Sequence, residues 1–412
     1  MAKVTVPVKE QADQFQISPD YVRISMAAAI QLGLKSGRMF RGATCGCINL
    51  LQNYPEGCYA NCAYCGLARE RPGNPEENTF IRVAWPLYAT SLVAEKIAEH
   101  EDEIGRVCIS QVQDHRAYQD LVDMTRRVRR KSLVPISALV SATTLNVERL
   151  YCIQDAGADI IGVGLDGASR EVFEKTRGKK ARGPHDWDYH WYIVREARRI
   201  YGPLKVNCHL VVGLGETDRD LIDLFYKAKA EQIAVYLFSF NPEPGTAMQQ
   251  VPRAPLHRWR RIQLTKYLIE QGGLDRSLIK FDEAGNLARI DAPDMLVEVA
   301  INTGLPFMTN GCPDKHGELA CNRPYGSYRP GEEFRDYPFL PMADDLIHIR
   351  QQMRLEEVWQ FPGTYPSDQR RCASEHSQLD NAASAASASH SGKLQGMRLS
   401  GSGQTKGEGE TA

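Results

Sequence analysis

The stretch that decides the fold is residues 47–66, CINLLQNYPEGCYANCAYCG. It opens with a short apolar run that predicts a buried strand and continues into a polar, turn-rich loop. Cys58, Cys62 and Cys65 stand in this loop at the spacing CxxxCxxC. Three thiolates on one tight loop can hold three corners of a cubane 4Fe-4S cluster and leave the fourth iron open. The open iron can then bind a substrate or a cofactor.

Other interpretations of this loop fit its residues less well. A zinc site more often needs a fourth nearby Cys or His, and a ferredoxin-type cluster needs four cysteines. Three buried thiols acting as small hydrophobic groups are not expected beside Pro55, Glu56, Gly57 and Asn61, which make the loop polar. The sequence therefore favours an iron–sulfur site with one open iron.

Composition narrows the class of protein. The 412 residues carry 50 Lys+Arg against 51 Asp+Glu, a balance that argues against a nucleic-acid or polyanion binder. The cysteine count of 11 is odd, which suits metal ligation in a reducing compartment better than a disulfide framework. No apolar run is long enough to span a membrane, and the first residues lack the apolar stretch of a signal peptide. We therefore expect a cytoplasmic protein without a membrane partner.

Eight short apolar runs alternate with amphipathic helical stretches over roughly 250 residues, the pattern of a parallel (β/α)8 barrel. An open doubly wound sheet is the alternative, and the number of repeats favours the barrel. In both folds the chemistry lies at the C-terminal ends of the strands. The apolar runs are residues 47–54, 106–112, 134–140, 158–164, 205–212, 233–240, 277–282 and 303–309.

The chain divides into four predicted parts. Residues 1–39 are expected to form a helical N-terminal extension, with a helix starting at the N-cap candidate Ser18. The barrel spans 40–310, and 311–366 form a cysteine-containing C-terminal extension that packs over one end of it. Residues 367–412 have almost no large apolar side chains, so this tail is predicted to be disordered.

The cysteine loop resembles that of the radical S-adenosylmethionine (radical SAM) superfamily, in which Tyr64 and Gly66 match an aromatic residue and a glycine. The resemblance covers most of residues 40–315. It implies a (β/α)8 TIM-type barrel whose open iron chelates S-adenosylmethionine (SAM). An electron from the cluster then cleaves SAM to a 5'-deoxyadenosyl radical, and the protein aims this radical at one hydrogen of the substrate.

Two later stretches are similar to the same family. Asp166 stands where biotin synthase-like enzymes carry an Asn-Leu-Asp, which implies a hydrogen bond to the ribose hydroxyls of SAM. The alternative is that Asp166 caps the helix that follows it. The stretch 212–217, VGLGET, resembles the family's strand-five motif, which implies that Gly213, Gly215 and Glu216 contact the cofactor. Taken alone, this stretch also fits an ordinary strand-to-helix junction.

Four more cysteines are candidates for a second, auxiliary 4Fe-4S cluster. Cys45 and Cys47 point to one face of an extended chain, and Cys312 and Cys321 follow the last predicted strand. A closed barrel makes the two pairs neighbours, although it places Cys47 at the start of one strand and Cys312 at the end of another. The alternative is that the pairs serve separate purposes. Three further cysteines lie within strand or helix patterns and are expected in the core: Cys108, Cys152 and Cys208.

The barrel together with the later GCP and CNRPY elements resembles a component of the two-protein lipoyl synthases. That family implies a sulfurtransferase whose carbon radical, formed on a protein-bound octanoyl chain, takes sulfur from the auxiliary cluster. The implied partners are an octanoylated lipoyl-carrier protein domain, a second radical SAM lipoyl synthase component and a reducing electron donor. The basic stretch 126–131 suits an acidic carrier, but a solvated helix face is the favoured interpretation.

Two rival functions remain open at this point. A biotin synthase-like enzyme acting on a free small molecule, by sulfur insertion or as a lyase or mutase, needs no auxiliary cluster at the proposed position. The third predicted strand offers Ser137 and Ser141 but no cysteine, which departs from biotin synthase itself. A non-enzymatic iron–sulfur scaffold needs neither the open iron nor the GLGET stretch.

Overall fold

The computed structural model describes residues 16–74, 79–80, 83–326 and 333–359. The predicted disordered tail, 367–412, lies outside these ranges. Within them, no helix is both long and apolar enough to cross a membrane.

Eight strands form one sheet in the spatial order β3-β1-β2-β4-β5-β6-β7-β8. The six strands β2, β4, β5, β6, β7 and β8 are parallel to their neighbours, whereas β1 is antiparallel to both β2 and β3. This mostly parallel sheet confirms the expected α/β barrel-type fold. The strands are β1 Tyr21–Ile24, β2 Cys47–Leu51, β3 Leu87–Ala89, β4 Arg106–Ser110, β5 Ile136–Val140, β6 Ala158–Asp166, β7 Val206–Val212 and β8 Ala234–Ser239.

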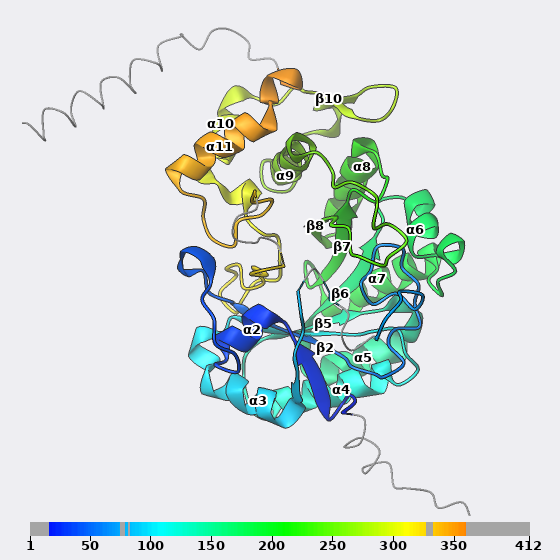
Figure 1. The fold of residues 1–412 in the computed structure, drawn as a ribbon. Helices are drawn as coiled ribbons and strands as arrows, with labels where there is room; N and C mark the ends of the chain where they lie inside the picture. The colour runs from blue at the N-terminus through cyan, green and yellow to red at the C-terminus, as the bar shows by residue number, and fades with distance from the viewer. Residues whose placement is uncertain (1–15, 75–78, 81–82, 327–332, 360–412) are drawn as a thin grey trace, which may run out of the picture. The chain divides into compact units, whose positions relative to one another are not determined.

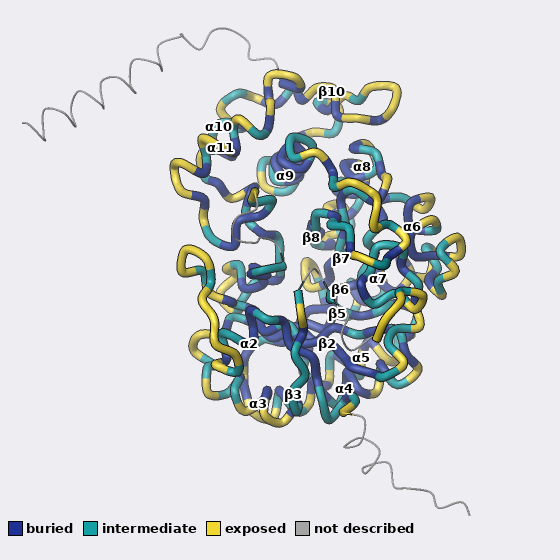
Figure 2. Tube along the Cα trace, viewed as in Figure 1, coloured by how far each residue is buried: buried dark blue, intermediate teal, exposed yellow. Residues whose placement is uncertain are grey.

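Helices connect the parallel strands, because such strands need a crossover connection. Figure 1 shows α3, α4, α5 and α7 along one side of the sheet, and Figure 2 shows buried strands with exposed helix surfaces. Helix α8 begins with a capping box between Thr217 and Asp220, which satisfies two backbone donors. The α-helices are α2 Met26–Gln31, α3 Thr90–Glu99, α4 Ala117–Arg129, α5 Val147–Asp155, α6 Arg170–Thr176, α7 Trp187–Tyr201, α8 Asp218–Ala230, α9 Leu256–Glu270, α10 Asp294–Thr303 and α11 Ala343–Met353. The short 3-10 helices are η1 Phe40–Gly42, η2 Glu101–Glu103, η3 Ala142–Thr144, η4 Lys179–Ala181, η5 Arg276–Leu278, η6 Leu305–Phe307 and η7 Leu355–Glu357.

The last two predicted strands do not join the sheet. Strand β9, Ile279–Phe281, instead pairs with β10, Leu287–Ile290, in a separate two-stranded sheet. The predicted run 303–309 is broken because Gly304 adopts a left-handed conformation (φ 69°) and Pro306 has no backbone N–H to donate. The parallel part of the sheet therefore stops at six strands in the described residues.

The N-terminal extension is only partly helical. The prediction of a helix starting at Ser18 is wrong, because Tyr21–Ile24 forms β1 with the side chains of Val22 and Ile24 fully buried. These β-branched residues suit a buried strand better than a helix. The helix starts later, at Met26, where Ser25 accepts a hydrogen bond from the backbone N–H of Ala28.

The C-terminal segment, residues 305–326, attaches to the first parallel strands. The Asn322 side chain donates to the carbonyl of Thr44 at 2.7 Å, just before β2. The Arg106 side chain, at the start of β4, donates from Nε to the carbonyl of Pro313 at 2.6 Å. Both contacts lie at the N-terminal ends of the parallel strands.

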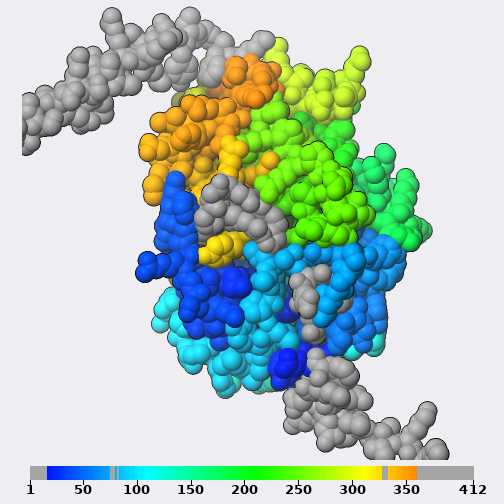
Figure 3. Space-filling view, viewed as in Figure 1, coloured from blue at the N-terminus to red at the C-terminus, as the bar shows by residue number. Residues whose placement is uncertain are grey.

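The same segment also reaches the far edge of the sheet. Arg323 donates to the carbonyl of Leu237 in β8 at 3.3 Å, and Tyr325 donates to the carbonyl of Arg38. Figure 3 shows the yellow C-terminal segment beside the blue N-terminal residues. Because residues 303–309 do not form a strand, both cysteines of this segment, Cys312 and Cys321, lie near the start of β2. Cys47 and Cys312 are therefore not at opposite ends of the barrel, as the sequence pattern had implied.

Candidate active site

A cavity of about 290 Å³ lies inside the parallel strands. Most of the strand residues in its wall alternate along their strand, as the two-residue period of a strand requires. The strand residues are Asn49 and Leu51 on β2, Cys108 and Ser110 on β4, Leu139 and Val140 on β5, Gly164 and Asp166 on β6, His209 and Val211 on β7, and Tyr236, Phe238 and Ser239 on β8. Thiols line both ends of this cavity.

The first group of thiols is the predicted one, on the loop after β2. The sulfur of Cys58 accepts the backbone N–H of Gln113 at 3.3 Å, and that of Cys65 accepts the N–H of Leu67 at 3.4 Å. Burial raises the pKa of Cys62 to about 12 and also raises the pKa of the other two thiols. All three line the cavity. As thiolates they need a cationic partner, and iron provides one.

Each of the three thiols of this loop can take a separate iron of a cubane cluster. Among the described residues, no group of three His, Cys, Asp or Glu side chains forms a site for a single metal ion. The loop packs tightly at Gly66, where an added Cβ would come within 2.1 Å of the Thr79 carbonyl oxygen. The loop therefore fits a 4Fe-4S cluster.

Beside this loop, Asp166 accepts two hydrogen bonds on one carboxylate oxygen. The donors are the Tyr64 hydroxyl and Nη1 of Arg177, and the same Nη1 donates to the Gly164 carbonyl at 2.6 Å. Asp166 does not cap α6, since Ser169 accepts the N-terminal hydrogen bond of that helix. The alternative role of Asp166 as a helix cap is therefore wrong, and its contact with the ribose stays a prediction.

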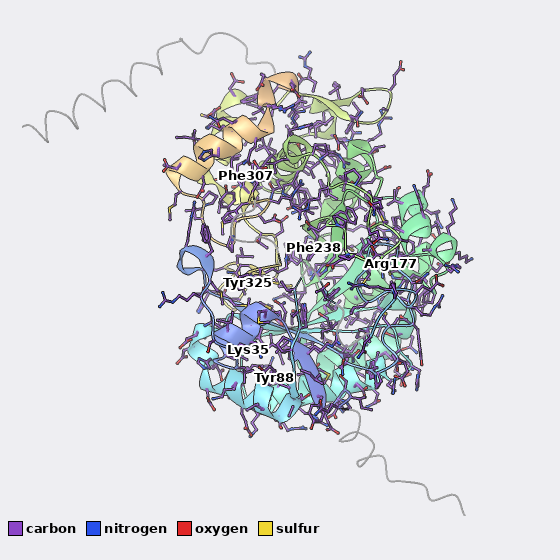
Figure 4. The ribbon with its side chains drawn as sticks, in the orientation of Figure 1. Lys35, Tyr88, Arg177, Phe238, Phe307 and Tyr325 are labelled. Carbon is purple, nitrogen blue, oxygen red and sulfur yellow. The ribbon has the colours of Figure 1, made fainter. Side chains whose placement is uncertain are left out.

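Arg177 is a site residue that sequence reasoning missed. Its guanidinium lines the cavity, and its Nε is buried without a hydrogen-bond partner. Figure 4 labels Arg177 on the right of the described chain and Phe238 nearer its centre. A buried donor without a partner costs free energy, so a bound anionic group would stabilise this arrangement. Arg177 follows the end of α6, where no local motif marks it.

The GLGET turn has a structural role in the described residues. Glu216 accepts the backbone N–H groups of Gly213 at 2.8 Å and Leu214 at 2.9 Å, and Arg258 donates to it at 3.0 Å. Gly213 and Gly215 have φ of 114° and 113°, a conformation that favours glycine. Within the described chain, none of Gly213, Gly215 or Glu216 lines the cavity. Their contact with the cofactor stays a prediction.

A second group of thiols, the four-thiol site, consists of Cys47, Cys108, Cys312 and Cys321, which pack together in one buried cluster. Three of them belong to the predicted auxiliary set. Cys45 does not join them, because its thiol donates to the Cys47 carbonyl at 3.1 Å and packs in the main core. Cys108 takes that place instead of lying in the core as expected.

The two-residue period of a strand explains why Cys108 belongs to the four-thiol site and why Cys208 does not. Cys108 is paired in register with Asn49 on β2, and both face the cavity. Cys208 faces outward into the main core, as predicted, while the next residue, His209, faces inward. One residue of offset reverses the face of a strand.

Hydrogen-bond donors surround the four-thiol site. Asn49 donates to Cys47 at 3.5 Å and to Cys321 at 3.8 Å, and Asn207 donates to Cys312 at 3.7 Å. A hydrogen bond from Cys47 lowers the pKa of Cys321 to about 6, despite its burial. Donors to sulfur stabilise thiolates and iron–sulfur clusters. The site therefore fits a buried anionic group.

The space between the two groups is mostly apolar. A five-residue strand such as β2 rises roughly 13 Å from end to end, so the groups lie at opposite ends of the cavity. Leu139, Val211 and Phe238 line the cavity, together with Ser110, which pairs in register with Leu139. The His209 ring lies 4.8 Å from that of Phe238, and burial lowers the pKa of His209 to about 3, so this imidazole is neutral.

The basic stretch 126–131 lies at the end of α4, and several of its side chains have partners within the protein. Arg127 pairs with Asp20 at 2.7 Å and with Asp123 at 2.8 Å. Arg129 donates to the Gly157 carbonyl at 3.1 Å. These contacts fit the favoured interpretation of a solvated helix face.

Comparison with known proteins gives one family match and several similar structures. Residues 53–228 match the family model of the radical SAM superfamily. Methylornithine synthase (PylB) is similar in structure, with a TM-score of 0.43 and 14% sequence identity over 81% of this chain and 87% of that chain. The hydrogenase maturase HydG from Carboxydothermus hydrogenoformans has a TM-score of 0.41 and 13% identity over 53% of this chain and 50% of that chain.

A third similar structure is the methyltransferase TsrM from Kitasatospora setae, with a TM-score of 0.34 and 15% identity over 80% of this chain and 55% of that chain. This chain thus spans about half the length of HydG and of TsrM. No curated protein matches by sequence. The chain contains a radical SAM superfamily domain, and the family implies a 4Fe-4S cluster and SAM.

Proposed function

We propose that this radical SAM enzyme inserts sulfur into an unactivated carbon atom of a bound acyl chain. The observation that carries the proposal is a cavity lined at one end by the CxxxCxxC thiols and at the other by Cys108, Cys312 and Cys321 of the four-thiol site. A substrate carbon between these ends has a radical source on one side and a sulfur source on the other.

Residues around the first cysteine loop would hold the cluster and the cofactor. Cys58, Cys62 and Cys65 would hold the cluster that, with SAM, supplies the 5'-deoxyadenosyl radical. Asp166 and Arg177 form a fixed polar wall beside that loop, which orients a bound cofactor. The apolar side chains of the cavity wall would limit the contact of the radical with water and other hydrogen donors.

The four-thiol site would hold the sulfur source, a second 4Fe-4S cluster. Its proposed ligands are Cys47, Cys108, Cys312 and Cys321, which revises the predicted set by exchanging Cys45 for Cys108. The sulfur source is consumed as a substrate of the reaction. One chain therefore completes the reaction once before the site must be rebuilt.

The apolar middle of the cavity suits an alkyl chain. Leu139, Val211 and Phe238 offer no charge to a substrate, and His209 is neutral. The proposed substrate is a protein-bound octanoyl chain, which makes the enzyme a lipoyl synthase-like sulfurtransferase. Its proposed partners are the octanoylated lipoyl-carrier protein domain, a second radical SAM lipoyl synthase component and a reducing electron donor.

The test is a single-turnover assay with the full chain, reconstituted anaerobically with isotopically labelled sulfide. Octanoylated carrier protein, SAM and a reductant are added, and 5'-deoxyadenosine and the carrier mass are measured. We expect labelled sulfur on the carrier. The matched control, Cys312→Ala/Cys321→Ala, should form 5'-deoxyadenosine without adding sulfur. Equal sulfur transfer by this control would contradict the proposal.

A further inference from the structure

Gln111 lines the cavity and has an amide group of which only the oxygen is used. Its Oε1 accepts from the backbone N–H of Ser141 at 3.1 Å and from the Thr144 hydroxyl at 3.2 Å. These two bonds fix the orientation of the amide, because a backbone N–H can only donate. The Nε2 atom is buried and has no hydrogen-bond partner among the described residues. A buried donor without an acceptor costs free energy, so a ligand carbonyl would stabilise this arrangement.

The ring of His185 also lines the cavity, and a chain of hydrogen bonds fixes its tautomer. The Ser141 hydroxyl donates to Oε1 of Gln113 at 2.7 Å, so its oxygen accepts from the Thr143 hydroxyl at 3.2 Å. The Thr143 oxygen in turn accepts from Nδ1–H of His185 at 2.7 Å. In a neutral imidazole with the proton on Nδ1, Nε2 is a hydrogen-bond acceptor.

The His185 imidazole is neutral in the folded chain. Its side chain is buried, and desolvation together with the nearby positive charge of Arg177 holds the pKa of His185 well below its usual range. In the part of the chain that the structure describes, the hydrogen bond of this ring is the one from Nδ1 to Thr143. The Nε2 lone pair is therefore left for a ligand that has an N–H or O–H group.

The Gln111 side chain lies where an acyl chain could be held by its carbonyl end. Gln111 and Ser141 are the first residues after β4 and β5, at the carboxyl-terminal edge of these parallel strands. Cys108 of the four-thiol site lies three residues before Gln111, roughly 10 Å away along an extended strand. An extended octanoyl chain has a similar length. A chain held at Gln111 and running along β4 would thus bring its far carbons to the four-thiol site.

We propose that Gln111 and His185 bind the amide group that links the acyl chain to the lysine of its carrier. The inference rests on the proposed function. Nε2 of Gln111 donates to the amide carbonyl, and Nε2 of His185 accepts the amide N–H. A secondary amide offers both groups, whereas a thioester or an oxygen ester has a carbonyl but no N–H. The pair therefore selects an acyl-lysine over an acyl thioester and sets the depth of the chain in the cavity.

The experiment compares two forms of the octanoylated carrier domain, one with the amide and one with an ester oxygen in place of the lysine N–H. Each is titrated into the anaerobically reconstituted full chain with SAM and without a reductant, so that no reaction occurs, and calorimetry gives the Kd. We expect the amide form to bind roughly tenfold more tightly, because the ester leaves the His185 acceptor without a partner. His185→Asn can still donate to Thr143 but lacks Nε2, so it should bind both forms equally.

Gln111→Glu tests the other half of the pair. The carboxylate can still accept from Ser141 and Thr144, but the amide donor is lost. Both carrier forms have a carbonyl, so both should bind roughly tenfold more weakly and keep their ratio of affinities. The matched control is His100→Asn, which changes a histidine that contacts Glu103 away from the cavity wall. It should leave both affinities unchanged.

Equal binding of the two forms by the unmodified chain would overturn the proposal without the use of any variant. A ratio that stays at the wild-type value in His185→Asn, with the fold retained by circular dichroism, would also overturn it. Weaker SAM binding in His185→Asn at an unchanged ratio would assign this histidine to the cofactor instead. If neither form binds the unmodified chain, the acyl-lysine substrate of the proposed function fails, so the two failures are distinguishable.

Discussion

The side-chain amide of Asn49 donates to the sulfur of Cys321 at 3.8 Å, although the two residues are 272 positions apart in the chain. The same amide lies 3.5 Å from the sulfur of Cys47. An amide on the first parallel strand thus joins thiols from both ends of the domain. The four-thiol site is made by the fold, and its ligand set follows from tertiary structure.

That ligand set can be tested by comparing two cysteines. In the background that lacks Cys58, Cys62 and Cys65, adding Cys108→Ala should remove the iron of the second site, because a cubane needs its thiolates. Adding Cys45→Ala should leave the iron bound, since this thiol packs in the main core. Iron and acid-labile sulfide per chain measure both. Loss of iron on changing Cys45 and retention on changing Cys108 would restore the original set.

The polar wall beside the first loop predicts a change in SAM affinity. Asp166→Asn removes the charge that fixes Arg177, and loss of such charge-assisted hydrogen bonds costs about 1.5–3 kcal/mol. We expect SAM to bind roughly tenfold to a hundredfold more weakly, measured by equilibrium dialysis with reconstituted protein. Tyr64→Phe removes only the hydroxyl bonded to Asp166 and should have a smaller effect. Unchanged affinity in Asp166→Asn would remove this residue from the cofactor site.

The GLGET turn predicts a loss of stability at a position away from the cavity. Arg258 donates to both Glu216 and Asp218, and the Glu216 side chain is fully buried. Arg258→Met leaves that carboxylate unpaired and should lower the free energy of unfolding by about 3–5 kcal/mol. Urea denaturation measures the change. The control Arg170→Met breaks an exposed pair with Asp188 and should cost less than about 1 kcal/mol; equal costs would contradict this role of Arg258.

A buried carboxyl group predicts a pH dependence of stability. Burial raises the pKa of Asp120 in the folded chain from 3.8 to about 6, and the Tyr54 hydroxyl donates to it at 2.6 Å. The folded state therefore holds more protons than the unfolded state between about pH 4 and 6. Stability contributed by this group is present below about pH 4 and is lost as the pH rises to 6.

Asp120→Asn removes this titration. It should make the chain more stable at pH 7 by about 1–3 kcal/mol and flatten the change between pH 4 and 6. Urea denaturation at a series of pH values measures both effects. Asp123→Asn on the same helix, which breaks a half-exposed pair with Arg127, is the control and should change stability by less than about 1 kcal/mol. An unaltered pH profile in Asp120→Asn would show that Asp120 is not the group responsible.

Features that depend on nearby residues could be predicted from the sequence. The loop at 58–65 is defined by spacing alone, and the first six predicted strands rest on short apolar runs between turn residues. The last two runs looked similar, but Gly304 and Pro306 interrupt one of them. Here the backbone preferences of two residues override the apolar pattern.

Features that depend on register or on distant contacts could not be predicted in the same way. Cys108 joins the four-thiol site because β4 pairs with β2 so that Asn49 and Cys108 lie side by side. Arg177 reaches the cavity from a segment that no motif distinguishes, and Arg323 reaches it from the CNRPY element, in which no residue type pointed to the arginine. The alternation of Cys208 and His209 was a usable signal, since only one of two adjacent residues can face the interior.

The most direct test of the central claim is iron and acid-labile sulfide per chain, with Mössbauer spectra, after anaerobic reconstitution. Wild type is compared with Cys58→Ala/Cys62→Ala/Cys65→Ala. We predict two 4Fe-4S clusters in wild type and one intact cluster in the triple variant, held by the four-thiol site. One cluster in wild type and none in the triple variant would contradict the sulfur-insertion function.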